Sequence, residues 1–86
     1  MDTKTMTDSE VKKLMESKDY KKRFVGEYYE LKNRLTKLDD MLDKYDNGTL
    51  GFTFDCPYSL LSAQSNAMWT YLSILDTRAQ IEQIDL

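Results

Sequence analysis

Apolar side chains recur between residues 24 and 45 at alternating steps of four and three. The positions are Phe24, Tyr28, Leu31, Leu35, Leu38, Leu42 and Tyr45. A heptad seam sustained over three repeats indicates an amphipathic helix that packs against another helix. Ser17-Lys18-Asp19 offers a break and a new N-cap before the seam, and Gly48 stands where a glycine commonly follows a helix end. The pattern predicts a helix over residues 20–46, about 40 Å long at 1.5 Å per residue.

The turn-forming residues cluster directly after this helix. Asn47-Gly48, Gly51 and Pro57 fall within eleven positions, which predicts a connector over residues 47–56. Leu50, Phe52 and Phe54 alternate there with smaller residues and are expected to cap the end of the core. Pro57 suits the first position of a helix, so we expect a second long helix over residues 57–83.

The second helix carries a much wider apolar face than the first. An arc of about 180° holds Leu60, Leu61, Ala63, Ala67, Met68, Tyr71, Leu72, Ile74, Leu75, Ala79 and Ile81. One narrow seam cannot cover so wide an arc. We therefore expect this helix to contact both the N-terminal segment and a second copy of the chain.

The N-terminal segment has a helix signal of its own. Thr7-Asp8-Ser9-Glu10 has the form of a capping box, and Val11, Leu14 and Met15 follow at helical spacing. The sequence predicts a short helix over residues 8–16, within an appendage over residues 1–18. The expected fold is one all-α domain over residues 1–86: a long antiparallel helical hairpin with a short N-terminal helix, which self-associates.

Composition restricts the chemistry. The chain has 86 residues, 41% of them apolar and 31% charged, which allows one small domain. Histidine is absent and Cys56 is the single cysteine. The commonest general base, an intramolecular disulfide and a CxxC pair are therefore excluded, and we expect no enzyme, cofactor or metal site. No apolar run approaches the roughly 20 residues of a membrane span, so a cytoplasmic protein without membrane contact is expected.

Charge is divided unevenly along the chain. Residues 1–37 carry ten basic and seven acidic side chains, whereas residues 38–86 carry two basic and eight acidic ones. In a hairpin, the carboxylates gather at the closed end as an acidic tip formed by Asp39, Asp40, Asp43 and Asp46. The acidic tip could bind a basic partner protein by imitating nucleic acid, it could meet the basic end of another copy head to tail, or it could simply be solvated. Direct binding of nucleic acid by a chain of net charge −3 is not expected.

The open end of the hairpin holds the one cluster suited to a phosphate. Lys21, Lys22 and Arg23 lie between Tyr20 and Phe24. Basic groups beside aromatic rings can hold phosphates and stack a base. These three cations are therefore a candidate phosphate-binding site.

Two surfaces are candidates for partner binding or self-association. On the second helix, Trp69 lies among small uncharged residues that include Ser73, and tryptophan is enriched at interface hot spots. The alternative is that Trp69 packs under the N-terminal helix or the connector. On the first helix, Val25, Gly26 and Tyr29 form a small outward patch, in which the glycine would allow close approach of a neighbour or be neutral.

Arg78 falls inside the apolar arc of the second helix. In an antiparallel hairpin it comes level with Glu27 on the first helix. We expect an ion pair between them that fixes the register, because an unpaired buried charge costs several kcal/mol. The alternative is that Arg78 binds a ligand.

Two segments resemble a known group of proteins. They are YKKRFVGEYYELKNRLTKLDDML, residues 20–42, and CPYSLLSAQSNAMWTYLSILDTRAQIEQI, residues 56–84. Together they resemble short, mostly uncharacterised proteins of phages and prophages, a group related to crAss-like phages. The resemblance implies phage origin and a helical hairpin over residues 20–84, and it implies no activity.

Phage origin favours three hypotheses. The first is an anti-CRISPR-like inhibitor that binds a host defence protein in the host cytoplasm, with the acidic tip making charge contacts and Trp69 or Tyr29 the apolar anchor. The second is an oligomeric sponge that sequesters a cyclic-nucleotide immune signal at Lys21, Lys22 and Arg23. The third is an assembly or accessory protein whose partner is itself or another phage protein.

Overall fold

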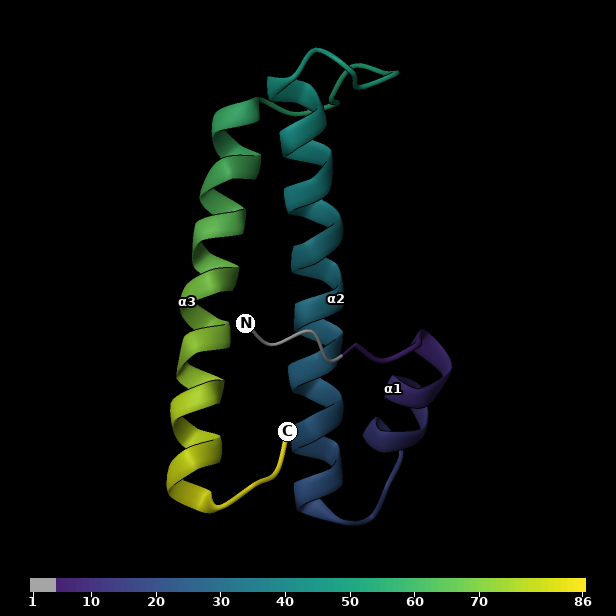
Figure 1. Ribbon diagram of the computed structural model, residues 1–86, viewed down its shortest axis with the longest axis vertical. Helices are drawn as coiled ribbons and strands as arrows, with labels where there is room; N and C mark the ends of the chain where they lie inside the picture. The colour runs from purple at the N-terminus through teal and green to yellow at the C-terminus, as the bar shows by residue number, and fades with distance from the viewer. Residues whose placement is uncertain (1–4) are drawn as a thin grey trace.

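The computed structural model describes residues 5–86, which form three helices and no strand. They are α1 (Asp8–Met15), α2 (Tyr20–Asp46) and α3 (Tyr58–Glu82). The two long helices run antiparallel, and α1 lies against α2 on the side away from α3 (Figure 1). The prediction of an all-α hairpin with a short N-terminal helix is confirmed. Residues 1–4 of the expected appendage lie outside the described residues.

Side-chain signals in the sequence mark three of the helix ends. The Glu10 N–H donates to Thr7 Oγ1 at 3.2 Å and the Thr7 N–H donates to Glu10 Oε1 at 3.3 Å, which completes the capping box of α1. Asp19 caps α2 by accepting a hydrogen bond from the Lys21 N–H at 3.0 Å. Gly48 follows α2 with a φ of +72°, a conformation that glycine adopts without strain.

The predicted start of α3 is off by one residue. Pro57 is the N-cap, with a ψ of 142°, and the first helical residue is Tyr58. The Pro57 carbonyl oxygen accepts a hydrogen bond from the Leu60 N–H at 3.0 Å, so Pro57 still anchors the first turn.

The C-terminal end of α3 has no glycine to mark it in the sequence. Gln83 ends the helix in the left-handed conformation, with a φ of 56°, and the Ile84 N–H donates to the Ala79 carbonyl at 2.8 Å. The chain then folds back toward α2 (Figure 1). This return buries Ile84 in the core.

α1 covers the patch that was expected to face outward. Gly26 is buried, and a Cβ atom there would lie 2.7 Å from Met15 Cγ and 2.9 Å from the Met15 backbone nitrogen. Tyr29 is fully buried in the same core cluster as Val11 of α1, and Val25 is half-buried. The expected outward patch is therefore wrong, because the apolar side of α1 requires cover and finds it on α2.

α3 turns only part of its wide apolar arc toward α2. The side chains on the α2 side are spaced as a heptad seam: Leu61, Ser65, Met68, Leu72, Leu75 and Ala79. Leu60, Tyr71, Ile74 and Ile81 remain exposed. The expectation that the N-terminal helix covers part of this arc is wrong, because α1 packs against α2 rather than α3.

The connector places aromatic side chains at the closed end of the hairpin. The Tyr45 ring stacks on Phe54 at 5.2 Å and on Tyr58 at 4.8 Å between centroids. Phe52 remains exposed, so the expected apolar cap is only partly formed.

Candidate functional site

Asp39 joins the two long helices instead of facing outward. Its carboxylate accepts hydrogen bonds from the Ser65 hydroxyl and, at 2.8 Å, from the Trp69 indole N–H. Trp69 remains 52% exposed and packs under neither α1 nor the connector. Ser73, one turn further along α3, is exposed. The Trp69 side of α3 is thus tied to α2 through Asp39 and still open to solvent.

The rest of the acidic tip is exposed at the closed end. Asp40 pairs with Lys44 at 3.1 Å, and Asp46 accepts a hydrogen bond from the Tyr58 hydroxyl at 3.2 Å. This hydrogen bond raises the pKa of Tyr58, because it favours the protonated phenol. Asp43 is exposed between them. Of the four predicted carboxylates, three are therefore available to a partner, two of them with a neighbour already in contact.

The predicted basic cluster lies at the start of α2, beside the end of α3. Lys21, Lys22 and Arg23 are all exposed. Lys21 Nζ is 3.5 Å from the Gln83 carbonyl oxygen, and Arg23 donates to the Ser17 carbonyl at 3.0 Å. Lys21 thus reaches the end of α3 and Arg23 reaches the segment between α1 and α2, with Lys22 exposed between them.

A pocket of about 390 Å³ opens at this junction, which we call the Arg78 pocket. Its lining residues are Met15, Tyr20, Arg23, Phe24, Glu27 and Arg78. Arg23 is the member of the predicted basic cluster that lines the pocket, together with both flanking aromatic residues. The charged side chains of the lining are two guanidinium groups, of Arg23 and Arg78, and one carboxylate, of Glu27. The arrangement suits a ligand that combines negative charge with a flat ring.

Arg78 does not form the ion pair that was predicted. It pairs with Glu82 on its own helix, Nε to Oε2 at 3.0 Å, because a spacing of four residues places both on one side of α3. Its second contact is a hydrogen bond of 2.7 Å to the Tyr20 hydroxyl. The guanidinium carbon lies 5.0 Å from the centre of the Phe24 ring. Glu27 lies nearby as another wall of the pocket.

Hydrogen bonds link these polar groups into one network. The Tyr20 hydroxyl donates to Glu82 at 2.8 Å, which raises the pKa of Tyr20 and lowers that of Glu82. The bond from Arg78 lowers the pKa of Glu82 further, and Glu82 in turn raises the pKa of Arg78. The charged forms of Arg78 and Glu82 are thus mutually stabilised beside the pocket.

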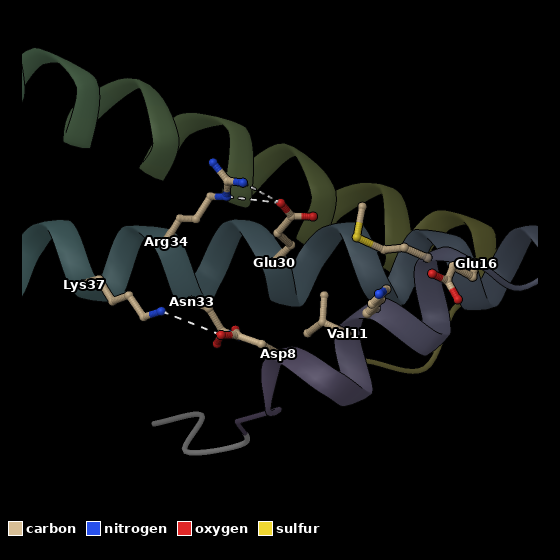
Figure 2. A pocket seen from close by; sticks show the side chains of 9 residues that line it. Asp8, Val11, Glu16, Glu30, Asn33, Arg34 and Lys37 are labelled. Atoms are coloured by element: carbon tan, nitrogen blue, oxygen red, sulfur yellow. Dashed lines mark hydrogen bonds and ion pairs between the residues drawn. The ribbon is translucent and has the colours of Figure 1, made fainter.

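A second hollow, of about 580 Å³, lies between α1 and α2 (Figure 2). Its six charged side chains are balanced: Lys12, Arg34 and Lys37 against Asp8, Glu16 and Glu30. Figure 2 shows the pairing of Arg34 with Glu30, at 2.9 Å, and of Lys37 with Asp8, at 3.9 Å. The lining charges of this hollow cancel, whereas the lining of the Arg78 pocket carries two cations and one carboxylate, so this hollow is less suited to an anion.

The described residues, 5–86, provide neither a cluster of metal ligands nor a membrane-spanning helix. No three histidine, cysteine, aspartate or glutamate side chains of this part gather in a way that could hold a metal ion. None of its helices has the length and hydropathy needed to cross a membrane.

Arg78 is the pocket residue for which the sequence favours a structural role over a ligand-binding one. It was assigned to a structural ion pair, whereas the structure places it beside Tyr20, Phe24 and Arg23. Two signals could have indicated this position of Arg78. In an antiparallel hairpin the start of α2 lies beside the end of α3, and the spacing of four residues lets Arg78 pair with Glu82.

Comparison with known proteins identifies the family. The model of the Sequestin family matches residues 18–81, most of the chain. The chain belongs to the Sequestin family. No curated protein and no solved structure matches it. The match covers α2, all of α3 except its last residue, and the lining of the Arg78 pocket except for Met15. It names no phage, so phage origin stays a prediction.

Proposed function

We propose that this Sequestin-family chain is a non-enzymatic protein of phage origin that sequesters a small anionic ligand in the host cytoplasm. A nucleotide signal of host defence is the ligand class that best fits. The observation that carries the proposal is the Arg78 pocket, in which Arg23 and Arg78 lie beside the rings of Tyr20 and Phe24. The family name specifies no ligand.

The chemistry of the pocket supports this class of ligand. Guanidinium groups bind phosphate oxygens through paired hydrogen bonds, and aromatic rings stack on bases. A volume of about 390 Å³ falls within the range of small-molecule sites. Because Glu82 holds Arg78 in the unliganded protein, a phosphate would compete with that carboxylate for the guanidinium.

A thermal-shift titration with cyclic dinucleotides tests the proposal, since a ligand that binds the folded state raises its melting temperature. We expect Arg23→Gln to abolish most of the shift. Lys22→Gln is the matched control, because it removes the same charge from the neighbouring exposed residue, which does not line the pocket. The nucleotide proposal is overturned if no probe shifts the melting temperature, or if the two variants weaken binding equally.

The second candidate function is inhibition of a basic host defence protein, such as a CRISPR effector, by the acidic tip. Asp40, Asp43 and Asp46 are exposed at the closed end, which favours it. The double variant Asp40→Lys, Asp43→Lys is expected to lose both binding and inhibition of the purified effector. Unchanged inhibition would exclude the acidic tip. Asp39 is left intact in this test because it holds Ser65 and Trp69.

The expected homo-oligomer belongs to the same proposal. A small sponge that carries one pocket per chain gains ligand capacity and core by self-association. The exposed apolar side chains of α3 support it, since α1 does not cover them.

A further inference from the structure

One side of α3 carries a second heptad stripe beside the seam that faces α2. We call it the outer stripe, and its members are Leu60, Gln64, Ala67, Tyr71, Ile74, Arg78 and Ile81. All seven are exposed. The large apolar members Leu60, Tyr71, Ile74 and Ile81 are 60%, 42%, 53% and 75% exposed. The outer stripe runs for about 32 Å along the helix at 1.5 Å per residue.

The spacing of the outer stripe is that of a helix-packing seam. Its steps alternate between four and three residues. The seam that faces α2 has the same steps, and each of its members directly follows a member of the outer stripe in sequence. A helix with two adjacent heptad seams packs against two other helices. α2 is one of these helices, and the second is absent from the described chain, because α1 packs on α2.

The outer stripe shows the same order of apolar and polar positions when it is read from either end. Tyr71 stands at its middle, flanked first by Ala67 and Ile74, then by Gln64 and Arg78, and finally by Leu60 and Ile81. An antiparallel pair of such stripes places Gln64 of each copy near Arg78 of the other and joins the apolar ends. A parallel pair would instead place Arg78 beside Arg78, which like-charge repulsion opposes.

We propose that α3 pairs antiparallel with α3 of a second copy, about a two-fold axis near Tyr71. This gives the homo-oligomer of the proposed function a defined interface and does not depend on the identity of the ligand. An isologous contact of this kind uses one self-complementary surface and closes at two subunits.

Charge supports the antiparallel orientation. In this arrangement the closed end of one copy, with Asp40, Asp43 and Asp46, lies beside the open end of the other, with Lys21 and Lys22. Opposite charges therefore meet at both ends of the dimer. A parallel dimer would bring the two acidic tips together.

The neighbouring surface of α2 offers a seat for the second copy. A hollow of about 230 Å³ lies beside Tyr71 and is lined on α2 by Glu27, Glu30, Leu31 and Arg34. An apolar side chain of the second copy fits against Leu31 there. At the far end of the outer stripe, the same pairing brings Leu60 and Gln64 of the second copy to the edge of the Arg78 pocket.

Molar mass in solution, measured by light scattering, tests the pairing. The wild-type protein is expected at twice the 10.1 kDa of the chain. Ile74→Asp is expected to halve the mass without loss of helical circular dichroism. Ser73→Asp is the matched control, because it places the same charge on the adjacent exposed residue, outside the outer stripe. A wild-type monomer, an oligomer that Ile74→Asp leaves intact, or a Ser73→Asp variant that dissociates would each overturn the proposal.

Thiol cross-linking in a Cys56→Ser background tests the orientation. Tyr71→Cys, near the two-fold axis, should cross-link to itself with a short reagent, whereas Leu60→Cys and Ile81→Cys should cross-link only when mixed. Self-cross-linking of Leu60→Cys alone indicates a parallel pair and overturns the orientation. The two proposals fail separately: a dimer that binds no nucleotide overturns the ligand alone, and a monomer that binds one overturns the pairing alone.

Discussion

Gly26 shows how one residue determines where an element can lie. In the interior of an exposed helix, glycine to alanine stabilises by about 1 kcal/mol. At Gly26 a methyl group would approach the Met15 backbone nitrogen to 2.9 Å, and that atom cannot move without displacing α1. We predict that Gly26→Ala lowers the free energy of unfolding by about 1–3 kcal/mol, as overpacking commonly does.

Urea denaturation measures this effect, with Gly51→Ala as the control. The Cβ of an alanine at position 51 would meet nothing within 4 Å, so its free energy of unfolding should stay the same or rise slightly. Stabilisation by Gly26→Ala would show that α1 does not rest on α2 as described.

Glu82 makes stability depend on pH at the acidic end of the range. Its pKa is lowered in the folded protein by the hydrogen bond from Tyr20 and by Arg78, so it binds protons less readily than in the unfolded chain. This contribution to stability is complete above the ordinary pKa of 4.5 and is lost as the pH falls through the folded value. Glu82→Gln should therefore lose less stability than the wild type between pH 7 and pH 3.

The measurement is urea denaturation at both pH values, and the comparison is the loss within each protein. Asp85→Asn, at an exposed carboxylate three residues along, controls for removal of one negative charge. An equal loss in wild type and Glu82→Gln would show that the network with Tyr20 and Arg78 does not persist in solution.

At the scale of elements, the docking of α1 rests on few apolar side chains. Val11 is the buried residue of this eight-residue helix. Burying a valine contributes about 1.5–3 kcal/mol, and a carboxylate in its place would have to remain hydrated. We predict that Val11→Asp undocks α1 while α2 and α3 stay helical.

Limited proteolysis with trypsin reports this change, because Lys12 and Lys13 lie in α1. Cleavage there should accelerate at least tenfold in Val11→Asp, since a loss of about 1.4 kcal/mol already opens the helix tenfold more often. Ser9→Asp, on the exposed side of α1, should be cleaved like the wild type. Equal protection of both variants would contradict the docking.

Helix ends were predictable where a side chain or a glycine marks them. The capping box at Thr7, the Asp19 cap and Gly48 fixed the bounds of α1 and α2 closely. The last turn of α3 has no such mark, because Gln83 adopts the left-handed conformation that glycine usually supplies. Its position depends on the burial of Ile84, which is a tertiary effect.

The candidate site was predictable in its residue types and not in its assembly. Arg23, Tyr20 and Phe24 are neighbours in sequence, so their cluster was visible. Arg78 reaches them only because of how α3 is oriented about its own axis when it packs on α2. A helical projection of the sequence cannot tell which half of a wide apolar arc faces α2. Gly26 likewise indicated a close neighbour without identifying it as α1.

At the scale of the whole molecule, the division of charge gives the proposed dimer a distinctive response to salt. Antiparallel copies bring each acidic tip beside a basic end, and salt screens this attraction over a Debye length of about 10 Å at 0.1 M. We predict that raising sodium chloride from 50 to 300 mM increases the dissociation constant of the dimer several-fold. The dimer should not dissociate completely, because the outer stripe is largely apolar. For a parallel dimer the affinity would change with salt in the opposite direction, since salt would relieve the repulsion between its acidic tips and strengthen association.

Sedimentation equilibrium over this range measures the dissociation constant, and Ile74→Asp should remain monomeric throughout. Strengthening by salt would contradict the antiparallel orientation, and complete dissociation would show that the charged ends, rather than the outer stripe, hold the copies together.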